Sequence, residues 1–136
     1  MKMANRLSIS DSDLALLAGK AQIELSRRDL GCFGEYVYQL ACYPHIRQWV
    51  DALADESISN VAIICPPGHG KSSWIGSIFP SWILGCHPEY HILYLSSTAS
   101  HAEKFSNTVR GVIASSKEYH QVFPHVKPDY AKGWST

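Results

Sequence analysis

The sequence has no excess of charge of either sign. Its 136 residues include 12 basic and 12 acidic side chains, so the formal net charge is zero. A marked basic excess would point to nucleic acid or to an anionic membrane as a partner. The balance gives no such indication, although it leaves room for a local basic patch.

Long apolar runs and a secretory leader are also missing from the sequence. No apolar stretch is long enough to cross a bilayer. The first apolar cluster is interrupted by Asp11, Asp13 and Lys20, a pattern that does not fit a signal peptide. We therefore expect a cytoplasmic protein without a membrane partner. Internal repeats and low-complexity segments are absent as well.

Cysteines are few and are not paired in the sequence. The four lie at positions 32, 42, 65 and 86, and none forms a C-x-x-C motif. This spacing does not favour a zinc site. Without a secretion signal, we expect them to be buried thiols. Cys65 lies beside the motif described next, where it is either a small residue filling a turn or a reactive thiol.

The most informative stretch is residues 61–73, which read VAIICPPGHGKSS. The apolar run from Val61 to Cys65 predicts a buried strand. Two prolines and two alternating glycines follow, and Lys71 then opens an amphipathic run that predicts a helix. A strand, a glycine-rich turn and a helix in this order are typical of a phosphate-binding loop.

Each residue type in this loop has a chemical reason to be there. Glycines let backbone amides approach a phosphate closely, and a helix N-terminus adds partial positive charge. Lys71 is the predicted catalytic residue, in contact with the β- and γ-phosphates, and Ser72 is the predicted ligand of Mg²⁺. The predicted ATP-binding residues are Pro66, Pro67, Gly68, His69, Gly70, Lys71, Ser72, Ser73 and Gln48.

The loop departs from the usual G-x-x-x-x-G-K-[ST] pattern. Cys65 occupies the first glycine position, and Pro66 and Pro67 have no N–H to donate. The donors must then come from residues 68–73. The alternative interpretation is a tight turn between a strand and a helix that contains Gly-Lys-Ser by chance.

The segment before the loop offers candidates for binding a base. Gln48 lies in a helix predicted from His45 to about Asp55, downstream of several aromatic side chains. Gln48 and these aromatics would hold an adenine, or Gln48 is simply a surface residue. His45 is open to two interpretations as well, a ligand contact or a structural histidine.

The remaining pattern predicts an α/β fold. A helix capped by Ser10 is expected to run to about Arg28. After the loop, a helix with a kink or break at Pro80 leads to a second buried strand at 91–96. A helix preceded by a capping box, Ser100 to Glu103, comes next. The β-α-β-α order implies parallel strands, with ligands at their carboxyl ends.

The hydroxyl side chains of residues 96–98 lie at such a strand end. They are candidates for contacts to nucleic acid or substrate, or they cap the following helix. A second acidic strand end, which a P-loop ATPase needs to hold Mg²⁺ and to activate water, is missing. None of the acidic residues after Lys71 ends an apolar run. Either the chain is a fragment, or it binds nucleotide without hydrolysing it.

From about residue 36 to residue 136 the chain resembles the large subunit of tailed-bacteriophage terminases. The motifs that carry the resemblance are Tyr43-Pro44-His45, Trp49, Pro66 to Ser72, Phe79-Pro80-Ser81-Trp82, Gly85, Pro88, Tyr94 to Ser97, Ala102, Phe105-Ser106, Val109-Arg110, Tyr119 and Phe123-Pro124. The resemblance implies an N-terminal helical segment over 1–35. Over 36–136 it also implies part of a P-loop NTPase domain of the RecA-like (ASCE) type, which is a parallel sheet with flanking helices. This part would stop before Walker B and the nuclease domain.

What the resemblance implies about function is a DNA-packaging motor. In that family ATP hydrolysis drives double-stranded DNA through a portal protein into a capsid, in the host cytoplasm. The implied partners are double-stranded DNA, the portal protein, the small terminase subunit and further copies of the large subunit. Two alternatives stay open, the first half of a helicase-like motor and a nucleotide-binding module that does not hydrolyse ATP.

Overall fold

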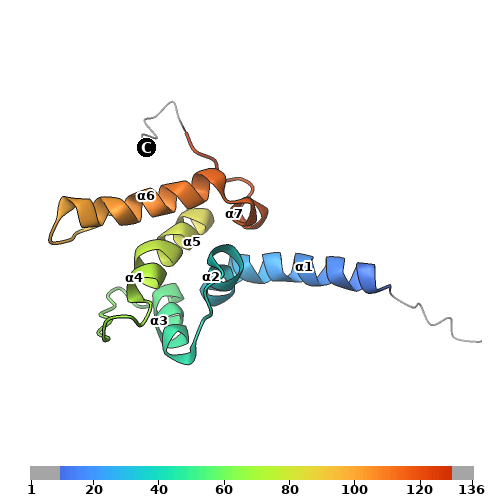
Figure 1. Cartoon of the computed structure of the whole chain (residues 1–136), viewed down its shortest axis with the longest axis horizontal. Coiled ribbons are helices and arrows are strands. Elements are labelled where there is room, and N and C mark those ends of the chain that lie inside the picture. The colour runs from blue at the N-terminus through green and yellow to red at the C-terminus, as the bar shows by residue number, and fades with distance from the viewer. Residues whose placement is uncertain (1–9, 130–136) are drawn as a thin grey trace, which may run out of the picture.

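The computed structural model describes residues 10–129, and within them 64% of the chain is helical with no strand or sheet. Figure 1 shows the first helix of the chain, in blue, projecting away from the other helices. In chain order they are α1 (Asp11–Arg28), α2 (Leu30–Tyr38), α3 (Pro44–Ala54), α4 (Lys71–Ser73), a π-helical turn (Trp74–Ile78), α5 (Phe79–Cys86), α6 (Ala99–Ser115) and α7 (Lys117–Val122).

The predicted parallel-sheet P-loop fold was wrong for the described residues. The two stretches expected as strands, 61–65 and 91–96, are neither helical nor part of a ladder. No backbone hydrogen bond joins them within residues 10–129. Both stretches are rich in residues that favour strands, but a strand forms only when another strand pairs with it.

The N-terminal helix was predicted correctly. Helix α1 begins at Asp11, and the hydroxyl of Ser10 accepts the amide N–H of Asp13 at 3.2 Å. At the other end, Arg27 donates to the carbonyls of Gln121 and Val122, at 3.1 and 2.6 Å. These carbonyls lie at the end of α7, where a helix leaves acceptors unpaired. One side chain therefore ties α1 to the C-terminal part of the described chain.

Asp29 organises the junction between α1, α2 and α3. Its carboxylate accepts the Cys32 amide at 2.7 Å, which caps α2, and two bonds from the Arg47 guanidinium at 2.7 and 2.9 Å. The guanidinium lowers the pKa of Asp29 to about 2. The fork geometry fixes the direction in which α3 leaves the junction.

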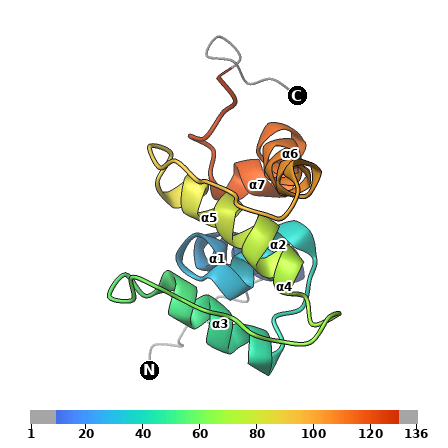
Figure 2. The same cartoon turned by 90° about the vertical axis from the view of Figure 1, so that its left-hand side faces the viewer.

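The core lies where α2, the run from Lys71 to Cys86, α6 and α7 meet (Figure 2). Phe33, Ile78 and Tyr119 are fully buried there, and Phe33 meets Tyr119 edge-on at a ring distance of 6.1 Å. Gly34 lets α2 approach closely, because a Cβ at that position would stand 2.3 Å from the Trp74 ring. The core is thus made by helical residues together with Phe123, which directly follows α7.

Pro80 was expected to kink or break its helix, and the structure shows a π-helical turn directly before this residue. The helical run is continuous from Lys71 to Cys86, but it widens into a π turn just before the proline. Pro80 has no N–H to give the carbonyl of Gly76, four residues back. That carbonyl instead accepts the hydroxyl of Tyr94 at 2.9 Å, so residues 91–96 are held against the helix.

Two smaller expectations were also wrong. Helix α6 begins at Ala99 after Thr98, without a side-chain cap, so the capping box predicted at Ser100 is not formed. The four cysteines are half-buried rather than buried. Burial still raises the pKa of Cys32 and of Cys86 to about 11, which keeps both thiols protonated at neutral pH.

None of the helices within residues 10–129 combines the length and the apolar character that crossing a bilayer requires.

Candidate functional site

Both glycines of the loop have a left-handed backbone conformation. Gly68 and Gly70 adopt positive φ angles of 84° and 81°, and His69 between them does not. The carbonyl of Gly70 accepts the amide of Trp74 at 3.0 Å, so the helical run starts directly after the second glycine. Glycine adopts positive φ without steric cost, and turns built on such residues are a common setting for anion-binding concavities.

All eight predicted loop residues line one hollow of about 320 Å³. They are Pro66, Pro67, Gly68, His69, Gly70, Lys71, Ser72 and Ser73. The hollow is open and exposed, since seven of the eight residues are solvent-accessible and only Gly70 is half-buried. Its wall contains one ammonium group and no carboxylate. An anion entering it would meet backbone amides, hydroxyls and Lys71 without repulsion.

Lys71 and Ser72 stand at a junction between two spaces. Both line the loop hollow, and both also border a larger groove of about 480 Å³ on the other side of the helix start. No ion pair of Lys71 with another described residue is formed, and the nearest carboxylates belong to neither lining. Its charge is therefore available to a ligand in either space.

A second hollow of about 490 Å³, the aromatic hollow, adjoins the loop on the side of α3. His45 lies in its wall, 5.8 Å from the His69 ring, and its Nε2 lies 3.4 Å from the His69 carbonyl oxygen. Tyr43 stacks parallel to His45 at a ring distance of 6.2 Å and is 59% exposed. Flat, exposed rings beside an anion-binding loop are suited to stacking against a nucleobase.

Gln48 of α3, a predicted base contact or else a surface residue, lies away from the loop. Gln48 is exposed and borders neither the loop hollow nor the aromatic hollow. His45, one turn earlier, faces the loop instead, and His69 reaches back to it. The helical period could have shown this, because the apolar Ile46 and Val50 fix which side of α3 is buried and so which residues flank the loop.

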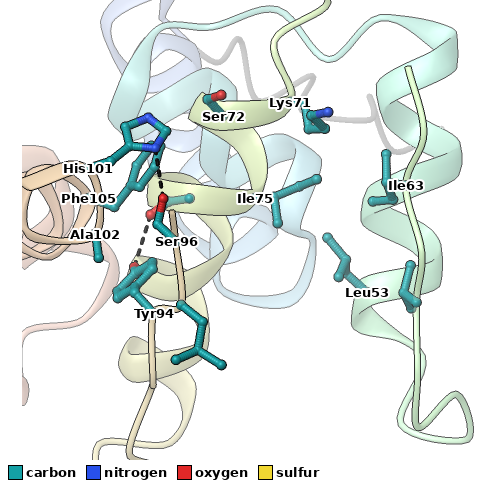
Figure 3. A pocket seen from close by; sticks show the side chains of 13 residues that line it. Leu53, Ile63, Lys71, Ser72, Ile75, Tyr94, Ser96, His101, Ala102 and Phe105 are labelled. Carbon is teal, nitrogen blue, oxygen red and sulfur yellow. Dashed lines mark hydrogen bonds between the residues drawn. The ribbon is translucent and has the colours of Figure 1, made fainter. Parts of the chain in front are cut away.

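Of the hydroxyl-bearing residues 96–98, Ser96 alone lines the groove beside Lys71. Ser96 lines it and bonds to the ring of His101 at 3.0 Å. Thr98 precedes α6 but makes no cap bond, although its hydroxyl accepts Ser100 at 3.4 Å. Figure 3 shows Lys71 and Ser72 toward one end of this groove, with His101 and Ser96 on the same side as Ser72. Lys71, Ser72 and Ser96 therefore border a common space.

Comparison with known proteins leaves this site to be interpreted from its own chemistry. The chain matches no protein-family model, no curated protein and no solved structure.

Proposed function

We propose that residues 66–73 bind the phosphate groups of a nucleotide, with ATP and Mg²⁺ as the natural ligands. The observation that carries this proposal is the hollow lined by all eight loop residues, with both glycines at positive φ. Lys71 would neutralise the phosphates. The hydroxyl of Ser72 is a ligand that Mg²⁺ accepts from protein, in addition to phosphate oxygens.

The aromatic hollow supports a nucleotide rather than a bare phosphate as the ligand. It shares His69 and Gly70 with the loop hollow, so a base stacked near His45 and Tyr43 and a phosphate chain in the loop belong to adjoining spaces. Comparing ATP with tripolyphosphate tests this part. ATP is expected to bind at least several-fold more tightly, and His45→Ala is expected to remove most of that advantage.

The main test is a binding titration of a fluorescent ATP analogue with Mg²⁺, monitored by anisotropy. Lys71→Ala is expected to weaken binding roughly 10- to 100-fold, because a charge-assisted contact contributes about 1.5–3 kcal/mol. Lys104→Ala on α6 is the matched control, since Lys104 is exposed and lines neither hollow. Equal affinities for the two variants would remove the basis of the proposal.

The same site argues for binding without turnover by this chain. Neither the loop hollow nor the groove beside Lys71 has an aspartate or glutamate in its lining. Within residues 10–129 there is also no cluster of three or more metal-binding side chains. A carboxylate is needed to position Mg²⁺ and to activate water. We expect no phosphate release, and hydrolysis abolished by Lys71→Ala would contradict this expectation.

The wider biological assignment is the ATP-binding part of a terminase large subunit, which packages phage DNA in the bacterial cytoplasm. Its support is the order of sequence motifs from Tyr43 to Pro124, together with the phosphate loop. Double-stranded DNA, the portal protein and the small subunit would be the partners. A nucleotide-binding module that does not hydrolyse ATP is the second candidate, favoured by the absence of carboxylates from the two linings. A cooperative thermal unfolding transition of the 136-residue chain would favour the module.

A further inference from the structure

Two non-helical segments run along the two sides of the groove beside Lys71. Figure 3 shows the segment carrying Ile63 on one side and the segment carrying Tyr94 and Ser96 on the other, with the helix start between them. The groove that they border measures about 480 Å³. The lining is Leu53, Val61, Ile63, Lys71, Ser72, Ile75, Gly76, Tyr94, Leu95, Ser96, His101, Ala102 and Phe105.

The backbone of both segments lacks partners within the described chain. No backbone–backbone hydrogen bond involves residues 61–65 or 91–95 in the part from 10 to 129. The bond from Tyr94 to Gly76 uses a side-chain hydroxyl and leaves the main chain unpaired. Each segment therefore offers a row of free donors and acceptors, which is what the edge of a sheet offers to an added strand.

The side chains of these segments are apolar on both faces. Ile63 and Tyr94 are half-buried on the helix side, whereas Ile64 and Leu93 are 96% and 81% exposed on the other. Leu95, at the rim of the groove, is 87% exposed. Alternation with a period of two assigns neighbours to opposite faces. Strands that are apolar on both faces are those that are covered on both sides.

The charges in the lining restrict what can occupy the groove. Its basic side chains are Lys71 and His101, and there is no carboxylate. Lys71 lies toward one end, and the middle of the groove is lined by uncharged residues such as Ile75 and Tyr94. An occupant with a positive charge beside Lys71 would be repelled, and one with a negative charge there would be attracted.

We propose that the groove binds an extended, apolar segment of a partner polypeptide by strand addition. An extended backbone can pair with the backbone groups that these two segments leave unpaired, and apolar side chains match the apolar lining between the segments. The end of the segment beside Lys71 carries an acidic residue or none. This inference does not depend on nucleotide binding, because it uses the two edges and the apolar lining.

The test uses a fluorescein-labelled peptide of about eight residues, rich in valine and isoleucine with a terminal glutamate, and the full chain without nucleotide. We expect saturable binding by anisotropy. A peptide with ¹³C carbonyls is expected to show the infrared band of a strand only when bound. Methylating alternate peptide nitrogens removes the donors and should abolish binding. Replacing the terminal glutamate by lysine should weaken binding several-fold.

Variants of the protein locate the binding surface. Leu95→Lys is expected to weaken peptide binding at least 10-fold, and its fold should be intact because the side chain is almost fully exposed. Ile63→Lys should have the same effect, since Ile63 lines the groove. Ile64→Lys is the matched control, as Ile64 is the adjacent residue and does not line it. Ile64→Lys is expected to bind within about two-fold of the unchanged protein.

Every result of this experiment decides the matter. Absence of saturable binding would overturn the proposal, as would equal weakening by Leu95→Lys and Ile64→Lys, which indicates a nonspecific apolar surface. Light scattering gives the third readout. Self-association that Leu95→Lys removes, with no peptide binding to the monomer, would make a second copy the occupant and would also overturn the proposal.

Discussion

The helical body and the segments flanking the glycine loop are both rich in apolar residues, yet they differ in how those residues are covered. Phe33 and Ile78 in the body are fully buried, whereas Ile64 and Leu93 beside the loop are 96% and 81% exposed. A helix closes its backbone hydrogen bonds within one segment and then needs only one covered face. A strand needs neighbours for both its backbone and its faces. The first region therefore covers its own apolar side chains, whereas the second leaves apolar side chains and backbone groups uncovered within the described residues.

The largest expected effect separates the two regions by stability. Phe33→Ala removes a fully buried ring from the centre of the body and is expected to cost about 3–5 kcal/mol of unfolding free energy. Leu93→Ala should change it by less than about 0.5 kcal/mol, because that side chain is exposed already. Urea denaturation measures both. Similar losses for the two variants would show that residues 91–96 are part of the folded core.

The next effect tests the close approach of α2 to the π turn. Gly34→Ala would place a methyl group 2.3 Å from the Trp74 ring and is expected to cost about 1–3 kcal/mol. Gly19→Ala in α1 is the matched control, since nothing lies within 4 Å of a Cβ there. That change should stabilise the chain by about 0.5–1 kcal/mol through helix propensity. Two changes of the same sign would argue against this packing.

A smaller effect concerns the junction at Asp29. Asp29→Ala removes the cap of α2 and the pair with Arg47, and should cost about 1–2 kcal/mol at neutral pH. Because the pKa of Asp29 is lowered to about 2, its contribution is complete above about pH 4 and is lost as the pH falls through 2. Unfolding measured across this range should show the variant and the unchanged protein converge at low pH.

Asp51→Ala provides the comparison for that junction. Asp51 bonds the same guanidinium at 3.2 Å, but its side chain is 63% exposed. Its removal should cost no more than about 0.5 kcal/mol. A loss as large as that of Asp29→Ala would mean that general charge balance around Arg47, rather than the cap of α2, stabilises the junction.

A further effect, no larger than that expected at Asp29, links the two regions directly. Tyr94→Phe deletes the hydroxyl that bonds the Gly76 carbonyl and should cost about 0.5–1.5 kcal/mol. In a Pro80→Ala background, residue 80 has an N–H that can donate a hydrogen bond to the carbonyl of Gly76. The cost of Tyr94→Phe should then shrink, as a double-mutant cycle by thermal or urea unfolding would show. An unchanged cost would disprove the link between Pro80 and Tyr94.

The parts that sequence reasoning predicted well are those determined by nearby residues. Ser10 marked the start of α1 and Pro44 the start of α3, because caps and first-turn prolines act within a single turn. Gly68 and Gly70 coincide with the two glycine positions of positive φ within the described residues. Helix and loop geometry are local properties, so a short window of sequence contains their causes.

The parts that sequence reasoning missed depend on distant residues. Residues 61–65 and 91–96 have the composition of strands, but pairing needs partners that the described chain does not bring to them. The aromatic hollow is formed by Tyr43 and His45 with His69, more than twenty residues later, so Gln48 was chosen for its chemistry alone. Knowledge of which side of α3 faces the loop would have been required.

The claim on which the function depends is that the amides of the glycine loop bind phosphate. It is tested most directly by ¹⁵N–¹H correlation spectra of the chain during titration with ADP and Mg²⁺. The amide signals of residues 68–73 should move together and saturate, and Lys71→Ala should require a much higher ligand concentration for the same change. Saturating shifts that bypass these six amides, or that are unaffected by Lys71→Ala, would contradict the account.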